Sequence, residues 1–145
     1  MKKPMNRILL FITGIAMLGM ISSCKEEGPH KEDIVKFTAN INSTPTVGTG
    51  AFEYNKVTRE LSYNISYSNI VPLSVTINHA TPGWQRGPVL INLTGFTGSQ
   101  VTGKTRALTL AEQAELINGL FYVNISPKDN PTKEVRGQIL PNDLD

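Results

Sequence analysis

Cysteine and histidine are scarce in this chain, and their scarcity limits the kinds of site that it can contain. The 145 residues include one cysteine and two histidines. A single cysteine cannot form an internal disulfide, and one isolated imidazole is not a zinc or copper site. We therefore expect a fold that its hydrophobic core stabilises, with no metal ion and no cofactor.

Neither sign of charge is in large excess. The chain has 14 basic and 12 acidic residues. Removal of a signal peptide would take away Lys2, Lys3 and Arg7 and leave 11 basic residues against the 12 acidic ones, a net charge of −1. Lysine and arginine form no cluster of the kind that contacts a phosphate backbone. We expect no nucleic-acid partner.

No apolar run is long enough to span a bilayer. The uncharged apolar run near the start of the chain covers residues 8–21, and a membrane-spanning helix needs roughly 20 residues. The run follows three basic residues and precedes two serines, as in a secretory signal peptide. We predict that residues 1–23 are a signal peptide. The alternative is a membrane anchor that stays on the chain.

The single cysteine, Cys24, comes directly after Ile21-Ser22-Ser23. This order resembles a bacterial lipobox, in which the cysteine is acylated and becomes the first residue of the mature protein. More than one acyl chain would anchor the protein stably, because each buried methylene contributes roughly 0.8 kcal/mol. We therefore predict lipidation of Cys24 and contact with the membrane through this lipid.

Residues 24–33 are mostly charged and lack apolar periodicity, so we predict a flexible tether. Lys25-Glu26-Glu27 resembles the signal that sends some Gram-negative lipoproteins to the outer face of the outer membrane, although a solvated linker is the alternative. We expect an outer-membrane lipoprotein, and leave open whether it faces the periplasm or the cell surface. His30 lies in the tether, where we expect no metal role.

Alternation of apolar and polar side chains predicts strands along the rest of the chain. The clearest case is 61–70, where Leu61, Tyr63, Ile65 and Tyr67 alternate with polar residues. Further strands are predicted at 37–42, 51–54, 73–79 and 89–94, and a less regular one at 104–108. Seven or eight short strands indicate an all-β domain at residues 34–141, an antiparallel β-sandwich or an open barrel.

The segment 122–139 predicts a final hairpin whose two arms are each half-buried. Its first arm alternates the apolar Val123 and Ile125 with the polar face of Tyr122, Asn124 and Ser126. Gly137 in the second arm indicates a bulge or a close backbone approach.

One short helix is predicted just before this hairpin. Thr109 and Glu112 have the spacing of a capping box, and Asn118-Gly119 supplies the end of the helix. Leu110, Ala114 and Ile117 recur at helical spacing and would form the apolar side.

Several residues are candidates for contact with a ligand. Trp84 lies in a Pro/Gly-rich loop, where it could anchor a partner or instead fold back over the core. His79 and Arg86 flank the same loop. Glu134 and Arg136 share a strand face, and we expect a structural polar pair there, with a partner-binding patch as the alternative. No nucleophile has a plausible base and the acidic residues are scattered, so we expect no catalytic residues and no enzyme.

Taken in order, several short segments resemble the CHRD domain, which is named for the repeats of chordin and also occurs alone in bacterial secreted proteins and lipoproteins. The resemblance covers about residues 37–140. The segments are Thr49-Gly50-Ala51, residues 61–67, His79 with Pro82-Gly83, Gly87-Pro88-Val89, Tyr122-Val123-Asn124-Ile125, Asn130-Pro131 and residues 134–139.

The resemblance implies a non-enzymatic binding or adhesion module with an extracellular protein or a glycan as its partner. Family members often carry a His-x-His before the Pro-Gly loop and another histidine after the Tyr-Val-Asn run. An ungapped placement puts Ile77, His79 and Ser126 at these positions. Only one histidine of three remains, which disfavours a metal site. A metal-binding protein or metalloenzyme centred on His79 is the alternative function.

Overall fold

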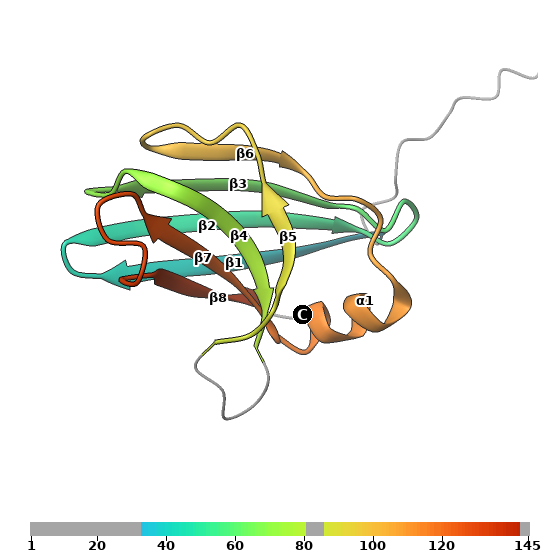
Figure 1. Cartoon of the computed structure of the whole chain (residues 1–145). Helices are drawn as coiled ribbons and strands as arrows, with labels where there is room; N and C mark the ends of the chain where they lie inside the picture. The colour runs from blue at the N-terminus through green and yellow to red at the C-terminus, as the bar shows by residue number, and fades with distance from the viewer. Residues whose placement is uncertain (1–32, 81–85, 143–145) are drawn as a thin grey trace, which may run out of the picture.

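The computed structural model describes residues 33–80 and 86–142, which form eight strands and one helix (Figure 1). All strand pairs are antiparallel, in the order β5-β4-β7-β8-β1-β2-β3-β6. In chain order the elements are β1 (Ile34–Ser43), β2 (Thr46–Asn55), β3 (Leu61–Ser68), β4 (Pro72–His79), β5 (Val89–Leu93), β6 (Gln100–Lys104), α1 (Leu110–Ile117), β7 (Phe121–Pro127) and β8 (Val135–Pro141).

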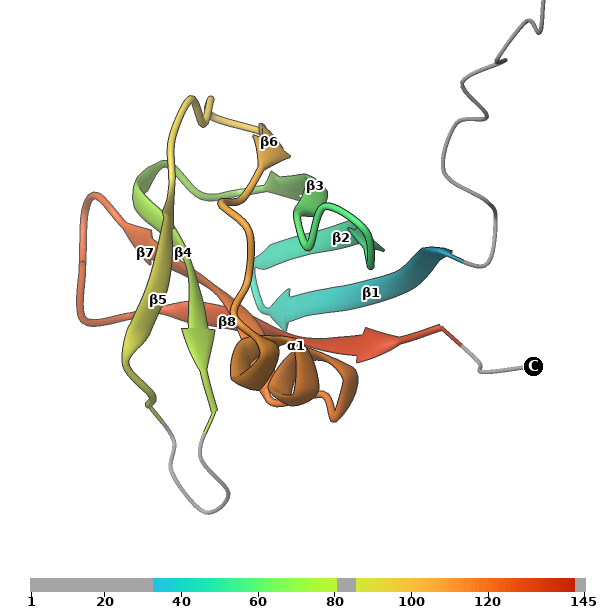
Figure 2. The same cartoon turned by 90° about the vertical axis from the view of Figure 1, so that its right-hand side faces the viewer.

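The sheet curls into a nearly closed barrel, with α1 at one end (Figure 2). The edge strands β5 and β6 follow each other in the chain. These features confirm the predicted all-β antiparallel fold with one short helix before the final hairpin. Of the two predicted architectures, a sandwich first and an open barrel second, the structure has the barrel. Within the described ranges, no helix is long and apolar enough to cross a membrane.

The core lies inside the barrel and comes from alternate residues of the strands. In β3, Leu61, Tyr63, Ile65 and Tyr67 are buried as predicted, while most of the residues between them are exposed. Each fully buried large apolar side chain contributes about 1.5–3 kcal/mol. The largest are Tyr54, Phe37, Phe52, Phe121, Ile41, Leu61, Ile65, Ile77, Leu108, Leu116, Ile125 and Ile139.

Strand β8 joins the two halves of the barrel because it pairs with different strands along its length. Its first part pairs with β7, where Val135 lies opposite Ile125, and its last part pairs with β1, where Ile139 lies opposite Ala39. Between the two, a Cβ on Gly137 would lie 2.6 Å from the carbonyl oxygen of Asn40. This confirms the close backbone approach that the sequence indicates at Gly137.

Strand β7 differs from the prediction, because all of its residues are buried rather than those of one face. Its polar face is covered by the segment before β5 and by the loop between β7 and β8. The backbone N–H of Gly87 donates to the Tyr122 hydroxyl at 2.9 Å, and the Ser126 hydroxyl donates to the Pro131 carbonyl at 3.0 Å. The half-buried prediction holds for β8, where Val135, Gly137 and Ile139 are buried.

The strand predicted at 104–108 is wrong, and β6 lies at Gln100–Lys104 instead. Gly103 belongs to β6 and pairs with Tyr63 of β3, and a Cβ there would lie 2.6 Å from the Tyr63 hydroxyl oxygen. Residues 105–108 cross the end of β3, where the N–H of Thr105 donates to the Leu61 carbonyl and the N–H of Leu108 to the Arg59 carbonyl.

The capping box of α1 is confirmed, since Thr109 accepts from the N–H of Glu112 and the Glu112 carboxylate accepts from the N–H of Thr109. The predicted apolar side of the helix is wrong for Leu110 and Ala114, which are exposed, whereas Ile117 packs against the core. Leu110 is 73 % exposed, whereas Leu116 is fully buried. The helix spans two turns, so its contact with the barrel end, rather than its own periodicity, selects the buried residue.

Replacing Gly137 with alanine should lower the free energy of unfolding by about 1–3 kcal/mol, because the new Cβ forces β8 away from the β1 backbone. Denaturant unfolding measures the change. Gly98→Ala is the matched control, since a Cβ at Gly98 meets nothing within 4 Å. Equal stability of the two variants would contradict the close approach.

The Glu112 carboxylate should make stability depend on pH. Hydrogen bonds from the Arg106 guanidinium, at 2.6 and 2.8 Å, and from the N–H of Thr109 lower its pKa from 4.5 to about 2. A lowered pKa in the folded state stabilises the fold above pH 4.5, and this contribution is lost as the pH falls towards 2. Since Arg106 is half exposed, we expect the contribution to be about 1 kcal/mol.

Glu112→Gln keeps a side chain that can complete the capping box but removes the charge. Its difference in unfolding free energy from the wild type, measured from pH 7 to pH 2, should shrink across this window. Glu53→Gln, which removes one partner of an exposed ion pair with Lys36, should show a smaller change. A constant difference for Glu112→Gln would contradict the assignment.

Candidate ligand-binding site

Strands β4, β7 and β8 carry polar side chains on their outer face, opposite the core. The register pairs Thr76 with Asn124 and Asn78 with Tyr122, so these side chains lie on the same face. All four residues are at most 8 % exposed. Burial of so many polar groups outside the core requires a cover, and it makes this face the candidate site.

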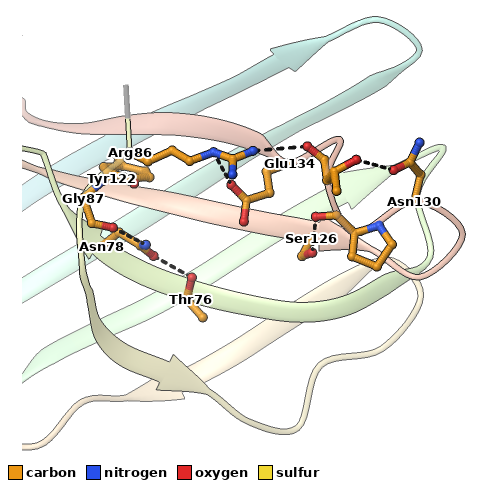
Figure 3. Close-up of polar contacts among 10 residues, drawn as sticks. Thr76, Asn78, Arg86, Gly87, Tyr122, Ser126, Asn130 and Glu134 are labelled. Atoms are coloured by element: carbon orange, nitrogen blue, oxygen red, sulfur yellow. Dashed lines mark hydrogen bonds and ion pairs between the residues drawn. The ribbon is translucent and has the colours of Figure 1, made fainter. Parts of the chain in front are cut away.

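The segment before β5 supplies part of this cover through a chain of hydrogen bonds (Figure 3). The Thr76 hydroxyl donates to Asn78 Oδ1 at 2.6 Å, and Asn78 Nδ2 donates to the Gly87 carbonyl at 3.1 Å. Gly87 in turn donates its N–H to the Tyr122 hydroxyl. A side chain does not fit at Gly87, because a Cβ would collide with the His79 carbonyl oxygen.

Arg86 links this segment to the loop between β7 and β8. Its Nε lies 3.4 Å from a Glu134 carboxylate oxygen, and its Nη2 donates to the Thr132 carbonyl at 3.3 Å (Figure 3). The Arg86 side chain is 69 % exposed. The two loops are therefore joined by one long, solvent-exposed ion pair and one long hydrogen bond.

Arg136 of β8 lies against the ring of Tyr122, with its guanidinium carbon 3.9 Å from the ring centre. This is cation–π distance. Gln138, two residues further on the same face, accepts from Arg136 at 3.4 Å and donates to the carbonyls of Gly119 and Phe121. Arg136 is therefore held in place by a ring on one side and a fixed amide on the other.

The two residues of the predicted polar pair, Glu134 and Arg136, each contact a different residue. Glu134 lies just before β8 beside Arg86, and Arg136 lies on the Tyr122 ring. Both nevertheless line one pocket of about 280 Å³, together with Arg86, Tyr122 and Asn124.

Asn124 is the distinctive residue of this pocket. It is 8 % exposed, and its carboxamide has no hydrogen-bond partner among the described residues. None of the buried side-chain nitrogen and oxygen atoms of the described residues lacks a partner, so the carboxamide atoms are open to the pocket. An amide that is open to a pocket offers both a donor and an acceptor to a ligand.

A larger cavity of about 1230 Å³ lies at the barrel end formed by residues 43–46, 69–71 and 127–135. Among the described residues, only Glu134 lines both this cavity and the polar pocket. The larger cavity is lined chiefly by turn and loop residues, and its charged residues Lys128, Asp129, Lys133 and Glu134 are exposed. The polar pocket gathers two arginines, one carboxylate and the Asn124 amide beside the buried strand β7. The polar pocket is therefore the better candidate for specific binding.

His79 lies at the end of β4, away from the polar pocket. Its Nε2 is 3.6 Å from a Glu115 carboxylate oxygen of α1. The positions Ile77 and His79 lie opposite Val123 and Phe121 on the core side of the sheet, whereas Ser126 lies on the outer face. The three positions that the ungapped placement assigns to family histidines therefore do not converge on one site.

In the ranges 33–80 and 86–142, no group of three or more His, Cys, Asp or Glu side chains could hold a metal ion. The predicted ligand contact Trp84, the lipidation site Cys24, and His30 lie outside the described residues. Arg86 is the predicted binding residue that the structure brings to the pocket.

Sequence reasoning missed Asn124 and Tyr122 as site residues. The signal was present in the alternation of Tyr122, Asn124 and Ser126 on one side of their strand and of Thr76 and Asn78 on another. The prediction assigned this polar face to solvent, and the cover that turns it into a pocket comes from segments distant in the sequence.

The family model of the CHRD domain matches residues 36–139, which covers the barrel from β1 to β8. Comparison with curated proteins and with solved structures found no match.

Proposed function

The chain belongs to the CHRD domain family, and from this premise we propose that it is a non-enzymatic binding or adhesion module that a lipid on Cys24 anchors in the bacterial outer membrane. Residues 1–23 are its signal peptide and residues 24–33 its tether. The partner is an extracellular protein or a glycan, and it binds at the polar pocket on the outer face of β7 and β8.

The observation that carries the proposal is the Asn124 amide, which opens into this pocket and has no hydrogen-bond partner among the described residues. The neighbouring Asn78 and Tyr122 make their hydrogen bonds within the protein. An amide in this position can pair with a ligand through both its N–H groups and its carbonyl oxygen.

The same lining favours binding over catalysis. Its five residues offer two guanidinium groups, one carboxylate, one amide and a phenol whose ring is covered by Arg136. These five described residues include no serine, threonine or cysteine nucleophile beside a base, and no second carboxylate to share acid–base work. Such a set fixes the orientation of a polar ligand without activating it.

The barrel is also suited to presentation from a surface. Strand β1 starts where the tether would end, and its ten residues extend about 33 Å to the turn that precedes β2. The loop that carries Glu134 lies at that far end (Figure 1). A lipid at the N-terminal end would leave this loop away from the attachment point.

Cys24→Ser should abolish lipidation. Cells expressing the wild type and fed an alkyne-bearing fatty acid should yield a labelled protein in the membrane fraction, and the variant should be unlabelled and released from that fraction. Ser23→Ala, which keeps the small residue before the cysteine, is the control and should be labelled. Label that persists in Cys24→Ser would overturn the anchor.

Asn124→Leu should separate binding from stability. Because the amide has no hydrogen-bond partner among the described residues, a leucine of similar size should leave the melting temperature unchanged or raise it. Binding of the labelled chain to arrays of glycans and secreted proteins should weaken by roughly tenfold or more, as expected for the loss of hydrogen bonds to a ligand.

Asn40→Leu, an exposed position of β1, is the matched control and should change neither quantity much. If Asn124→Leu lowers the melting temperature while the folded protein binds its partner as the wild type does, the pocket is structural and the proposed site is wrong.

A further inference from the structure

Among the described residues that line it, the polar pocket has two guanidinium groups, those of Arg86 and Arg136, and one carboxylate, that of Glu134. The Arg86 side chain is 69 % exposed, so it can reach a ligand. A negatively charged group of the ligand would find a cationic partner there. Guanidinium groups match the planar fork of a carboxylate and can donate two hydrogen bonds to it.

Arg86 can exchange its present partners for a ligand. Its contacts with Glu134 and Thr132 are 3.4 and 3.3 Å long, and its side chain is largely exposed. An exposed ion pair of this kind contributes little to stability. When Arg86 turns to a ligand carboxylate, the Glu134 carboxylate is left to accept hydrogen bonds, so the ligand should also bring donors.

The side of the pocket formed by Arg136 and Tyr122 is held in place by contacts within the protein. Arg136 is stacked on Tyr122, whose hydroxyl accepts from the N–H of Gly87, and Gln138 is held by two backbone carbonyls. A preorganised wall reduces the entropy that a ligand loses when it binds. The positive charge of Arg136 is therefore presented to a ligand at a defined position.

The remaining group, the Asn124 amide, pairs best with a group that both donates and accepts. A hydroxyl does both. The pocket volume of about 280 Å³ lies just below the range of drug-sized pockets, so it suits one small polar unit. We propose that the pocket binds a uronate unit of an acidic glycan, with its carboxylate at Arg86 and Arg136 and its hydroxyls at Glu134 and Asn124.

This assignment rests on the proposed function and names the ligand class of the same pocket. The test uses the full chain in detergent and measures the dissociation constant of trigalacturonate by calorimetry. Neutral galactotriose and the peptide triglutamate are the comparison ligands. The protein variants are Arg86→Gln, Asn124→Leu and the control Arg59→Gln, which removes the same charge from the exposed turn between β2 and β3.

We expect the wild type to bind trigalacturonate more tightly than either comparison ligand, and to bind it less tightly as the salt concentration rises. Arg86→Gln and Asn124→Leu should each weaken binding roughly tenfold or more. Arg59→Gln should bind as the wild type does.

Other results overturn the assignment. Tighter binding of galactotriose or triglutamate, lost in Asn124→Leu, would replace the uronate with a neutral sugar or an acidic peptide and leave the proposed function intact. Trigalacturonate binding that both pocket variants retain would place the ligand elsewhere. Binding of none of the three probes would reject the uronate, while the array experiment with Asn124→Leu separately decides the proposed function.

Discussion

The approach of β8 to the backbone of β1 at Gly137 sets the shape of the whole barrel. Because the position lacks a Cβ, β8 can pass from pairing with β7 to pairing with β1 within seven residues. The change of partner lets one strand belong to both halves of the sheet, so the two halves enclose a common core. It also fixes the position of β7, which lies between β8 and β4.

The pocket depends on the same strand. Gly137 and Ile139 of β8 point to the core side, so the alternating residues Arg136 and Gln138 point outwards beside Tyr122. The alternation of side chains along β8 therefore both closes the barrel and places the Arg136 guanidinium on the outer face. A one-residue shift of β8 would exchange the two faces and remove both.

Features set by neighbouring residues could be predicted from the sequence, and features set by distant contacts could not. The period-two pattern of 61–67 and the Thr109–Glu112 capping box are local, and the structure confirms both. Gly137 is an exception, because the missing side chain indicates a close approach although the backbone it approaches, at Asn40, is distant in the sequence. Leu110 was misassigned because the barrel end, rather than helical spacing, decides which side of α1 is buried. Likewise, the cover over β7 brings Arg86 to Glu134 across 48 positions of the chain, and no local pattern reports this.

The two walls of the pocket differ in how firmly they are held, and this difference suits a binding module. Tyr122 and Gln138 are fixed by hydrogen bonds to the backbone, and Tyr122 supports Arg136 through its ring. Arg86 is held by one exposed ion pair and one long hydrogen bond. Exchange at the Arg86 wall therefore changes few contacts of the barrel, because the core and the ladder between β7 and β8 do not involve it. The fixed wall can supply specificity, and the exchangeable wall can admit a ligand without unfolding the domain.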